Sequence, residues 1–375
     1  MTNFDPVSRN AAPFLHGPEF AAVTEALQAG QYGHNTATER FESELAQFLG
    51  VPQVVAVSSC TAALHVGLLL AGVGPGDEVV VPSQTFCATV QAILMTGAHP
   101  RFADIDATTL SVTSATVLEA ITPRTRAVVP VLYGGRAVDL GDLQRELDER
   151  GITVVEDAAH AFGSRLGTIR VGATGALTAF SFGPIKNLTC GEGGALIPRT
   201  PAQTDRARTL RLLGVSQSQA TRIRSTTYDV DTFGWRYHLS ALHAAIGSAQ
   251  LARFDAIETA RKTLWRAYAR ALADLDGVTM VDVDVEHSVP FNCVVRVAKR
   301  DSVFQFMRDR GIGVGVHYPP NHTQPAFAQW SRPLPVTEAT ADEIMSLPFH
   351  PAMTEPDVAR VAATLRDAIA YSRRS

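Results

Sequence analysis

The chain has 375 residues, 46% of them hydrophobic and 19% charged, with a net charge of −4 and both signs interspersed. This composition predicts a large core and about two domains, and it excludes the basic stripe of a nucleic-acid-binding protein. It also excludes a bilayer-spanning segment, because the longest apolar stretch, near residues 64–73, is interrupted by His65 and glycines. The first residues lack a basic segment followed by an apolar one, so we expect a cytoplasmic protein that binds no membrane.

Short apolar segments alternate with helical patterns over the first 240 residues. Strands are expected at 54–59, 78–82, 99–105, 126–133, 153–157, 177–182 and 195–198, and helices at 61–71 and 85–96. Strands that are apolar throughout and separated by helices indicate an α/β fold whose mostly parallel sheet is covered by helices on both faces.

The pattern changes near residue 239. One helix is predicted from about 240 to 275, because this stretch is broadly apolar and has no proline. Beyond it we expect strands at 278–283, 291–297 and 314–318, and helices at 300–310 and 356–372. The sequence therefore predicts a large domain over residues 1–240, with the N-terminal segment included, and a bridging helix with a smaller α+β domain over residues 241–375.

Lys186 follows an apolar strand and precedes a glycine-rich loop, so its stem would lie against buried backbone. A desolvated ammonium loses its proton more readily, and the neutral amine can form an imine with a carbonyl cofactor such as pyridoxal phosphate (PLP). Asp157 ends another apolar strand, where a carboxylate is costly to bury without a cation. A protonated pyridine ring would supply that cation, whereas the simpler alternative is that Asp157 caps a helix.

Ligands bind at the carboxyl ends of the strands in an open parallel sheet. Residues 58–63 join a strand to a helix, and the first amides of a helix attract anions, although Ser59 or Thr61 would also serve as an ordinary cap. Phe86 follows the next strand, where an aromatic ring either stacks on a planar cofactor or packs in the core.

Four motifs occur in an order that resembles the DegT-type sugar aminotransferases, which are fold type I PLP enzymes. They are Gly76–Phe86, Glu156–Ser164, Ser181–Gly194 and Gly315–His322. The resemblance implies that Lys186 forms the Schiff base with PLP and that Asp157 pairs with the pyridine nitrogen. It also implies that Phe86 stacks on the cofactor ring and that His160 lies near the 3-hydroxyl of the ring.

Phosphate contacts are implied by the same resemblance for Thr61, Ala62 and Ser181. Cys60 adjoins them where the family commonly has glycine, and its backbone amide would still serve if its dihedral angles are ordinary. Cys60, Cys87 and Cys190 each adjoin a cofactor motif, so we expect them around the pocket as small apolar fillers. The four cysteines show no metal-ligand spacing, and no metal is expected.

Arg236 stands where the family commonly has an asparagine that reaches the cofactor phosphate of the other subunit. An arginine there would pair with that phosphate, pair with a substrate anion, or lie at the surface. Arg136 also departs from the family pattern and has no assigned role. His317, Tyr318 and His322 lie on the small-domain segment that would face the pocket, where they would contact substrate or pack.

The resemblance implies transamination from L-glutamate or L-glutamine to a ketosugar, nucleotide-linked, in a homodimer with shared active sites, for natural-product or cell-surface glycan biosynthesis. The alternatives are a keto-cyclitol acceptor, a PLP-dependent sugar dehydratase, or a non-catalytic regulatory relative. Lys186 argues against the dehydratase, in whose relatives the lysine is typically replaced, and Lys186 and Asp157 together argue against the regulatory relative.

Overall fold

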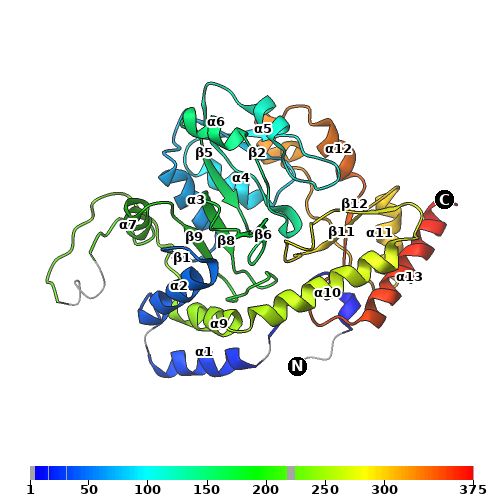
Figure 1. The fold of residues 1–375 in the computed structure, drawn as a ribbon, viewed down its shortest axis with the longest axis horizontal. Helices are drawn as coiled ribbons and strands as arrows, with labels where there is room; N and C mark the ends of the chain where they lie inside the picture. The colour runs from blue at the N-terminus through cyan, green and yellow to red at the C-terminus, as the bar shows by residue number, and fades with distance from the viewer. Residues whose placement is uncertain (1–4, 16, 31, 218–223, 375) are drawn as a thin grey trace.

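The computed structural model describes residues 5–15, 17–30, 32–217 and 224–374, which form a large α/β unit and a smaller α+β unit (Figure 1). Within these residues the large sheet has the order β1-β9-β8-β5-β4-β2-β3, and β9 runs antiparallel to both of its neighbours while the other pairs are parallel. The strands are β1 (Val55–Val57), β9 (Gly194–Ile197), β8 (Leu177–Ser181), β5 (Thr153–Asp157), β4 (Thr125–Val128), β2 (Glu78–Pro82) and β3 (His99–Ala103). The mostly parallel sheet is as predicted.

Helices cover both faces of this sheet, because successive side chains of each strand enter different cores. Val79 and Val81 of β2 pack into one core, and Val80 packs into another. The helices of the large unit are α1 (Pro18–Gln28), α2 (Thr36–Leu49), α3 (Cys60–Leu70), α4 (Cys87–Leu94), α5 (Ser114–Ala120), α6 (Leu143–Glu149) and α7 (Pro201–Leu210). A short hairpin, β6 (Arg165–Leu166) with β7 (Ile169–Arg170), lies outside the large sheet.

The single helix predicted from 240 to 275 is wrong, because the structure has two helices, α9 (Ala241–Leu251) and α10 (Phe254–Leu272). Arg253 lies between them with a non-helical backbone. The break packs the ring of Phe254 edge-on against the stacked rings of Phe48 and Phe162. Burial of one aromatic side chain thus interrupts a stretch that has no proline, and α10 runs on to the smaller unit (Figure 1).

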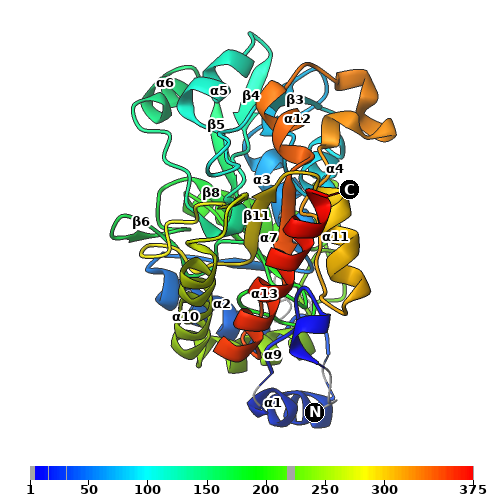
Figure 2. The same cartoon turned by 90° about the vertical axis from the view of Figure 1, so that its right-hand side faces the viewer.

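The smaller unit contains an antiparallel sheet of β10 (Val278–Met280), β11 (Cys293–Val297) and β12 (Ile344–Leu347). Its helices are α11 (Arg300–Asp309), α12 (Pro335–Ala341) and α13 (Glu355–Ser372), and Figure 2 shows α11 and α13 side by side. The strand predicted at 314–318 is wrong: only Gly315 pairs with this sheet, through Ser346. The residues after it turn toward the large unit, where Gln84 Nε2 donates to the carbonyls of His317 and Tyr318 at 3.2 and 3.1 Å.

The N-terminal segment packs against the smaller unit. Val7 belongs to its core, and Gly313 donates its backbone N–H to the Val7 carbonyl at 2.7 Å. The division into domains of residues 1–240 and 241–375 stays a prediction. The segment around Val7, although it belongs to the first range, packs with the second. The described residues also form four short 3₁₀ segments, which are η1 (Pro6–Ser8), η2 (Tyr133–Gly135), η3 (Asn321–Thr323) and η4 (Pro325–Trp330). In the parts of the chain that the structure describes, none of the helices has the length and apolarity to cross a bilayer.

Candidate active site

Polar residues gather where strands β1, β2, β5 and β8 end, as the strand order predicts. Asp157 is the last residue of β5 and is only 5% exposed. Its Oδ2 accepts a hydrogen bond from Thr89 Oγ1 at 2.7 Å, and its Oδ1 accepts the backbone N–H of Ala159 at 3.1 Å. Burial still raises the pKa of Asp157, because these donors and the Lys186 charge only partly offset the desolvation. A cation beside this carboxylate would therefore stabilise its charged form.

Lys186 lies in the loop between β8 and β9. Its Nζ lies 4.4 Å from the centre of the Phe291 ring. Burial lowers the pKa of Lys186 to about 8, while the nearby Cys60 and Asp157 raise it and Arg261 lowers it. The amine is thus partly neutral near physiological pH, as a nucleophile or base requires.

The glycine-rich loop after Lys186 allows backbone to approach backbone. A Cβ atom at Gly194 would lie 2.6 Å from the carbonyl carbon of Ser59 and 2.7 Å from the amide nitrogen of Cys60. Glycine is therefore required for β9 to pack against the start of α3. Asn187 holds the other end of the loop, because its Nδ2 donates to the Val289 carbonyl at 2.9 Å.

The start of α3 is open to an anion. The Ser59 Oγ accepts the backbone N–H of Ala62 at 3.1 Å, and the first intrahelical bond runs from Ala63 N–H to the Ser59 carbonyl. The backbone amides of Cys60 and Thr61 precede that bond and are available to an anion. The Ala62 amide, also expected to contact phosphate, already donates to the Ser59 side chain that caps the helix. Ser181 pairs with Gly194 in the sheet, which places Ser181 beside this helix start.

Cys60 replaces glycine without backbone strain, because it is the first residue of α3 and is not among the described residues with positive φ. Its Sγ donates to the Ala179 carbonyl at 3.7 Å and lies 4.0 Å from Asp157 Oδ1. Burial raises the pKa of the Cys60 thiol well above its usual value, so the thiol is neutral. Cys87 is exposed beside Phe86, and Cys190 packs in the core that contains Phe41.

His160 is held in one tautomer. The backbone N–H of Gly134 donates to His160 Nδ1 at 3.4 Å, so the ring proton is on Nε2, which donates to the Tyr318 hydroxyl at 3.1 Å. Burial keeps the pKa of His160 well below its usual value, and the imidazole is therefore neutral. Its ring stacks on Phe291, with 4.0 Å between ring centres.

Phe86 lies at the mouth of the site. It is 56% exposed, and its ring centre lies 5.5 Å from that of Tyr318. An exposed aromatic ring at this position is free to cover a planar ligand.

The residues present fit PLP. Asp157 would hold the pyridinium, Lys186 would meet the carbonyl carbon, and the amides that start α3, with Ser181, would hold the phosphate. The observation that supports the fit is the buried Asp157 carboxylate, whose few donors leave it in need of a cation.

The structure does not turn all three suggested residues of the small-domain segment, His317, Tyr318 and His322, toward the site. Burial, with a smaller contribution from the nearby Lys186 charge, lowers the pKa of His317 to about 4. The Nδ1 of His317 lies 2.8 Å from Ser346 Oγ. Tyr318 faces the site through His160. His322 does not face it: it is 3% exposed, with Nδ1 2.7 Å from Ser83 Oγ and Nε2 3.4 Å from Glu338 Oε1. A packing role for His322 therefore replaces substrate contact.

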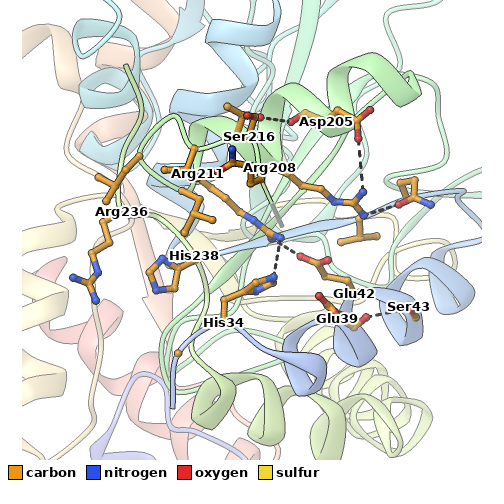
Figure 3. A pocket seen from close by; sticks show the side chains of 18 of the residues that line it. His34, Glu39, Glu42, Ser43, Asp205, Arg208, Arg211, Ser216, Arg236 and His238 are labelled. Carbon is orange, nitrogen blue, oxygen red and sulfur yellow. Dashed lines mark hydrogen bonds and ion pairs between the residues drawn. The ribbon is translucent and has the colours of Figure 1, made fainter. Parts of the chain in front are cut away.

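The two departing arginines both lie outside this group. Arg136 pairs with Asp282 at 2.8 Å. Arg236 is exposed and lines a cavity of about 1080 Å³ that lies between α2 on one side and α7 with the residues that follow it on the other (Figure 3). The lining of this cavity includes His34, Arg211 and His238 but not Lys186 or Asp157.

Sequence reasoning missed several supporting residues. Thr89 could have been found, because it lies three residues after Phe86, on the first turn of the helix at the site. Phe291 and Arg261 carry no local signal, since only the tertiary fold brings them to Lys186.

Comparison with known proteins decides the family. Residues 15–366 match the model of the DegT/DnrJ/EryC1/StrS aminotransferase family. The chain belongs to this family. It is therefore a PLP-dependent aminotransferase, as the sequence predicted.

Solved structures agree with the assignment. The aminotransferase TlmJ from Streptoalloteichus hindustanus is 36% identical, with a TM-score of 0.91 over 97% of this chain and 99% of that one. DesV from S. venezuelae, solved in complex with a ketimine intermediate, is 34% identical, with a TM-score of 0.88 over 95% and 98% of the two chains. Spr1654 from Streptococcus pneumoniae in its PLP form is 26% identical, with a TM-score of 0.89 over 96% and 98%.

Proposed function

We propose that this aminotransferase moves an amino group from L-glutamate or L-glutamine to a nucleotide-linked ketosugar, making an aminosugar for natural-product or cell-surface glycan biosynthesis. The observation that carries the proposal is the proximity of a buried carboxylate, Asp157, to a lysine of lowered pKa, Lys186, at one sheet edge. Support for a sugar acceptor comes from similar proteins, since CalS13 from Micromonospora echinospora is a sugar aminotransferase 29% identical to this chain.

Each proposed catalytic residue has a defined task. PLP, when bound, supplies a carbonyl carbon for the amine and a ring that accepts electrons. The Asp157 carboxylate keeps the ring nitrogen protonated by offering it a buried negative charge. Lys186 would take the proton from the α-carbon of the amino donor in the first half of the reaction and would give a proton to the acceptor carbon of the ketosugar in the second half, which its pKa of about 8 allows.

The remaining residues hold the reactants. Phe86 would cover the ring, Thr61 and Ser181 would bind the phosphate with the Cys60 amide, and neutral His160 offers no competing positive charge to Lys186. Tyr318 would meet the substrate side of the site, since its hydroxyl accepts from His160 and its ring adjoins Phe86. His317, the residue before it, is held by the contact of its Nδ1 with Ser346 Oγ.

We also propose a homodimer, acting in the cytoplasm, in which each subunit completes the other's site. The described residues 224–233 extend away from the large unit on the left of Figure 1, and they expose Tyr228, Val230 and Phe233, the last by 92%. Arg236 has no side-chain partner within the described part of its own chain and lies apart from its own Lys186. Both features suit contact with a second subunit, where Arg236 would reach an anion.

The decisive experiment is a panel of nucleotide ketosugars and keto-cyclitols, each incubated with the enzyme, PLP and L-glutamate or L-glutamine. The proposal expects a new aminosugar by mass spectrometry, with 2-oxoglutarate formed in step when glutamate is the donor. Amination of cyclitols alone would replace the acceptor class. Loss of a sugar hydroxyl without amino transfer would indicate the dehydratase, and no turnover or cofactor binding would indicate the regulatory relative.

A control variant ties the result to the site. Lys186→Ala should lose amino transfer and the borohydride-stable cofactor adduct on the peptide that contains residue 186. Transfer at the normal rate by this variant would refute the assignment of Lys186.

A further inference from the structure

Arg261, on α10, is a buried cation without a carboxylate partner in the described residues. It is 2% exposed, and its Nη1 donates to the backbone carbonyls of Pro290 and Phe291 at 3.3 and 3.1 Å. Its Nε is buried and has no hydrogen-bond partner. Most buried charges are paired, because an unpaired one is costly to desolvate. A contribution to the stability of the fold therefore does not explain why an arginine is buried at this position.

The two carbonyls belong to a segment that reaches the active site. Phe291 donates its backbone N–H to the Gly134 carbonyl at 2.9 Å, and the Val289 carbonyl accepts from Asn187, the residue after Lys186. The Phe291 ring then lies under Lys186 Nζ and stacks on His160. Arg261 thus holds the backbone of the residue whose side chain contacts both groups.

We propose that Arg261 is a positioning residue for the Lys186 amine, acting through the Pro290 and Phe291 carbonyls and through the Phe291 ring. The inference rests on the proposed role of Lys186. Arg261 touches neither substrate nor cofactor in this arrangement. Its guanidinium suits the task, because it donates to two adjacent carbonyls while its stem remains in an apolar environment.

Electrostatics supports the same conclusion. The groups that act on Lys186 are Cys60 from α3, Asp157 from β5 and Arg261 from α10, and the Lys186 charge also acts on His160 and His317. Among these, Asp157 favours the ammonium form, whereas the positive charge of Arg261 lowers the pKa of Lys186 and favours the neutral amine. Removal of Arg261 should therefore raise the pH at which Lys186 becomes reactive.

The chain allows a direct test, because it has only three lysines, Lys186, Lys262 and Lys299. Cofactor-free protein is labelled with trace acetic anhydride across a pH series, and each lysine is quantified by peptide mass spectrometry. In the Arg261→Met variant we expect the Lys186 midpoint to rise by about half a unit, which slows labelling at pH 7 about threefold. Lys299, whose Nζ donates to the Ser372 carbonyl at 2.9 Å, serves as the internal reference.

Two further variants separate positioning from general stability. Arg261→Lys keeps the cation and should return the midpoint toward the wild-type value, and it decides the matter if Arg261→Met does not fold. Arg266→Met, on the exposed face of the same helix, removes only a pair with Glu286 and should leave the midpoint unchanged. A wild-type Lys186 profile in folded Arg261→Met would overturn the proposal. Because no cofactor or sugar is present, this result is independent of whether the acceptor assignment is right.

Discussion

Thr89 Oγ1 donates its only proton to Asp157 Oδ2 at 2.7 Å. The Thr85 hydroxyl lies 2.8 Å from Thr89 Oγ1 and must therefore be the donor in that second hydrogen bond. The two threonines form a directed chain that ends on the carboxylate proposed to hold the cofactor. The hydrogen bond from Thr89 lowers the pKa of Asp157 against the opposing effect of burial. The first turn of α4 thus tunes a residue on β5.

Thr89→Val should weaken cofactor retention, because it removes this donor without changing side-chain volume much. We expect the dissociation constant for PLP to rise roughly tenfold, as a hydrogen bond to a charged group contributes about 1.5 kcal/mol. Equilibrium dialysis with detection of the cofactor absorption measures it. Thr89→Ser keeps the hydroxyl and should behave as wild type, and equal losses in both variants would point to packing rather than to the hydrogen bond.

The pKa of Lys186 sets a pH dependence for cofactor capture. The neutral amine is the reactive form, and its fraction rises as pH increases through the pKa of about 8. We therefore expect the rate of PLP capture by cofactor-free enzyme to increase about tenfold from pH 6 to pH 7 and to level off above pH 8. Stopped-flow absorbance measures the rate. A rise that continues toward pH 10 would mean that Lys186 titrates as an ordinary, solvated lysine.

Cysteine reactivity tests the environment of Cys60. Burial holds the pKa of its thiol high, whereas Cys87 is exposed, so iodoacetamide at pH 7.5 should label Cys87 first and Cys60 at least about tenfold more slowly. Cys190 and Cys293 are buried and should remain unlabelled until the protein unfolds. Peptide mass spectrometry gives the four rates, and urea-unfolded protein is the control. Faster labelling of Cys60 than of Cys87 would contradict a part-buried thiol that stays neutral.

The position of a site residue could be predicted from sequence where the residue directly ends or follows a recognisable strand. Asp157 and Lys186 follow apolar strands of a parallel sheet, and the carboxyl ends of such strands share one edge, so their proximity follows from local patterns. His322 could not be placed this way. It shares a motif with Tyr318, yet the 3₁₀ segment that begins at Asn321 directs it to Ser83 instead.

Features of the fold that depend on tertiary packing could not be predicted from the sequence either. The parallel sheet follows from uniformly apolar strands, but the break between α9 and α10 has no proline or glycine to mark it, and the burial of Phe254 decides it. Arg261 reads in the sequence as one more cation of an amphipathic helix. Only the packing of α10 against residues 290–291 shows that it is buried.

An ion pair between Glu42 and Arg211 is buried beside the cavity of Figure 3 and stabilises the fold. Glu42 Oε1 also accepts the Ala56 backbone N–H at 2.8 Å, and Arg211 Nη1 donates to the Ala56 carbonyl at 2.6 Å, so the pair joins α2 and the end of α7 to β1. Arg211→Met leaves a buried carboxylate uncompensated and should lower the free energy of unfolding by about 3 kcal/mol in urea titrations of cofactor-free protein.

The double variant Glu42→Met with Arg211→Met removes both charges and should recover much of that loss, because the cost lies mainly in the unpaired charge. Arg145→Gln, which breaks an exposed pair with Asp142, is the control and should change the free energy of unfolding by less than about 0.5 kcal/mol. If the double variant were as unstable as Arg211→Met, the contribution of Arg211 would come from its hydrogen bond to Ala56 and its packing. The ion pair would then matter less than its burial suggests.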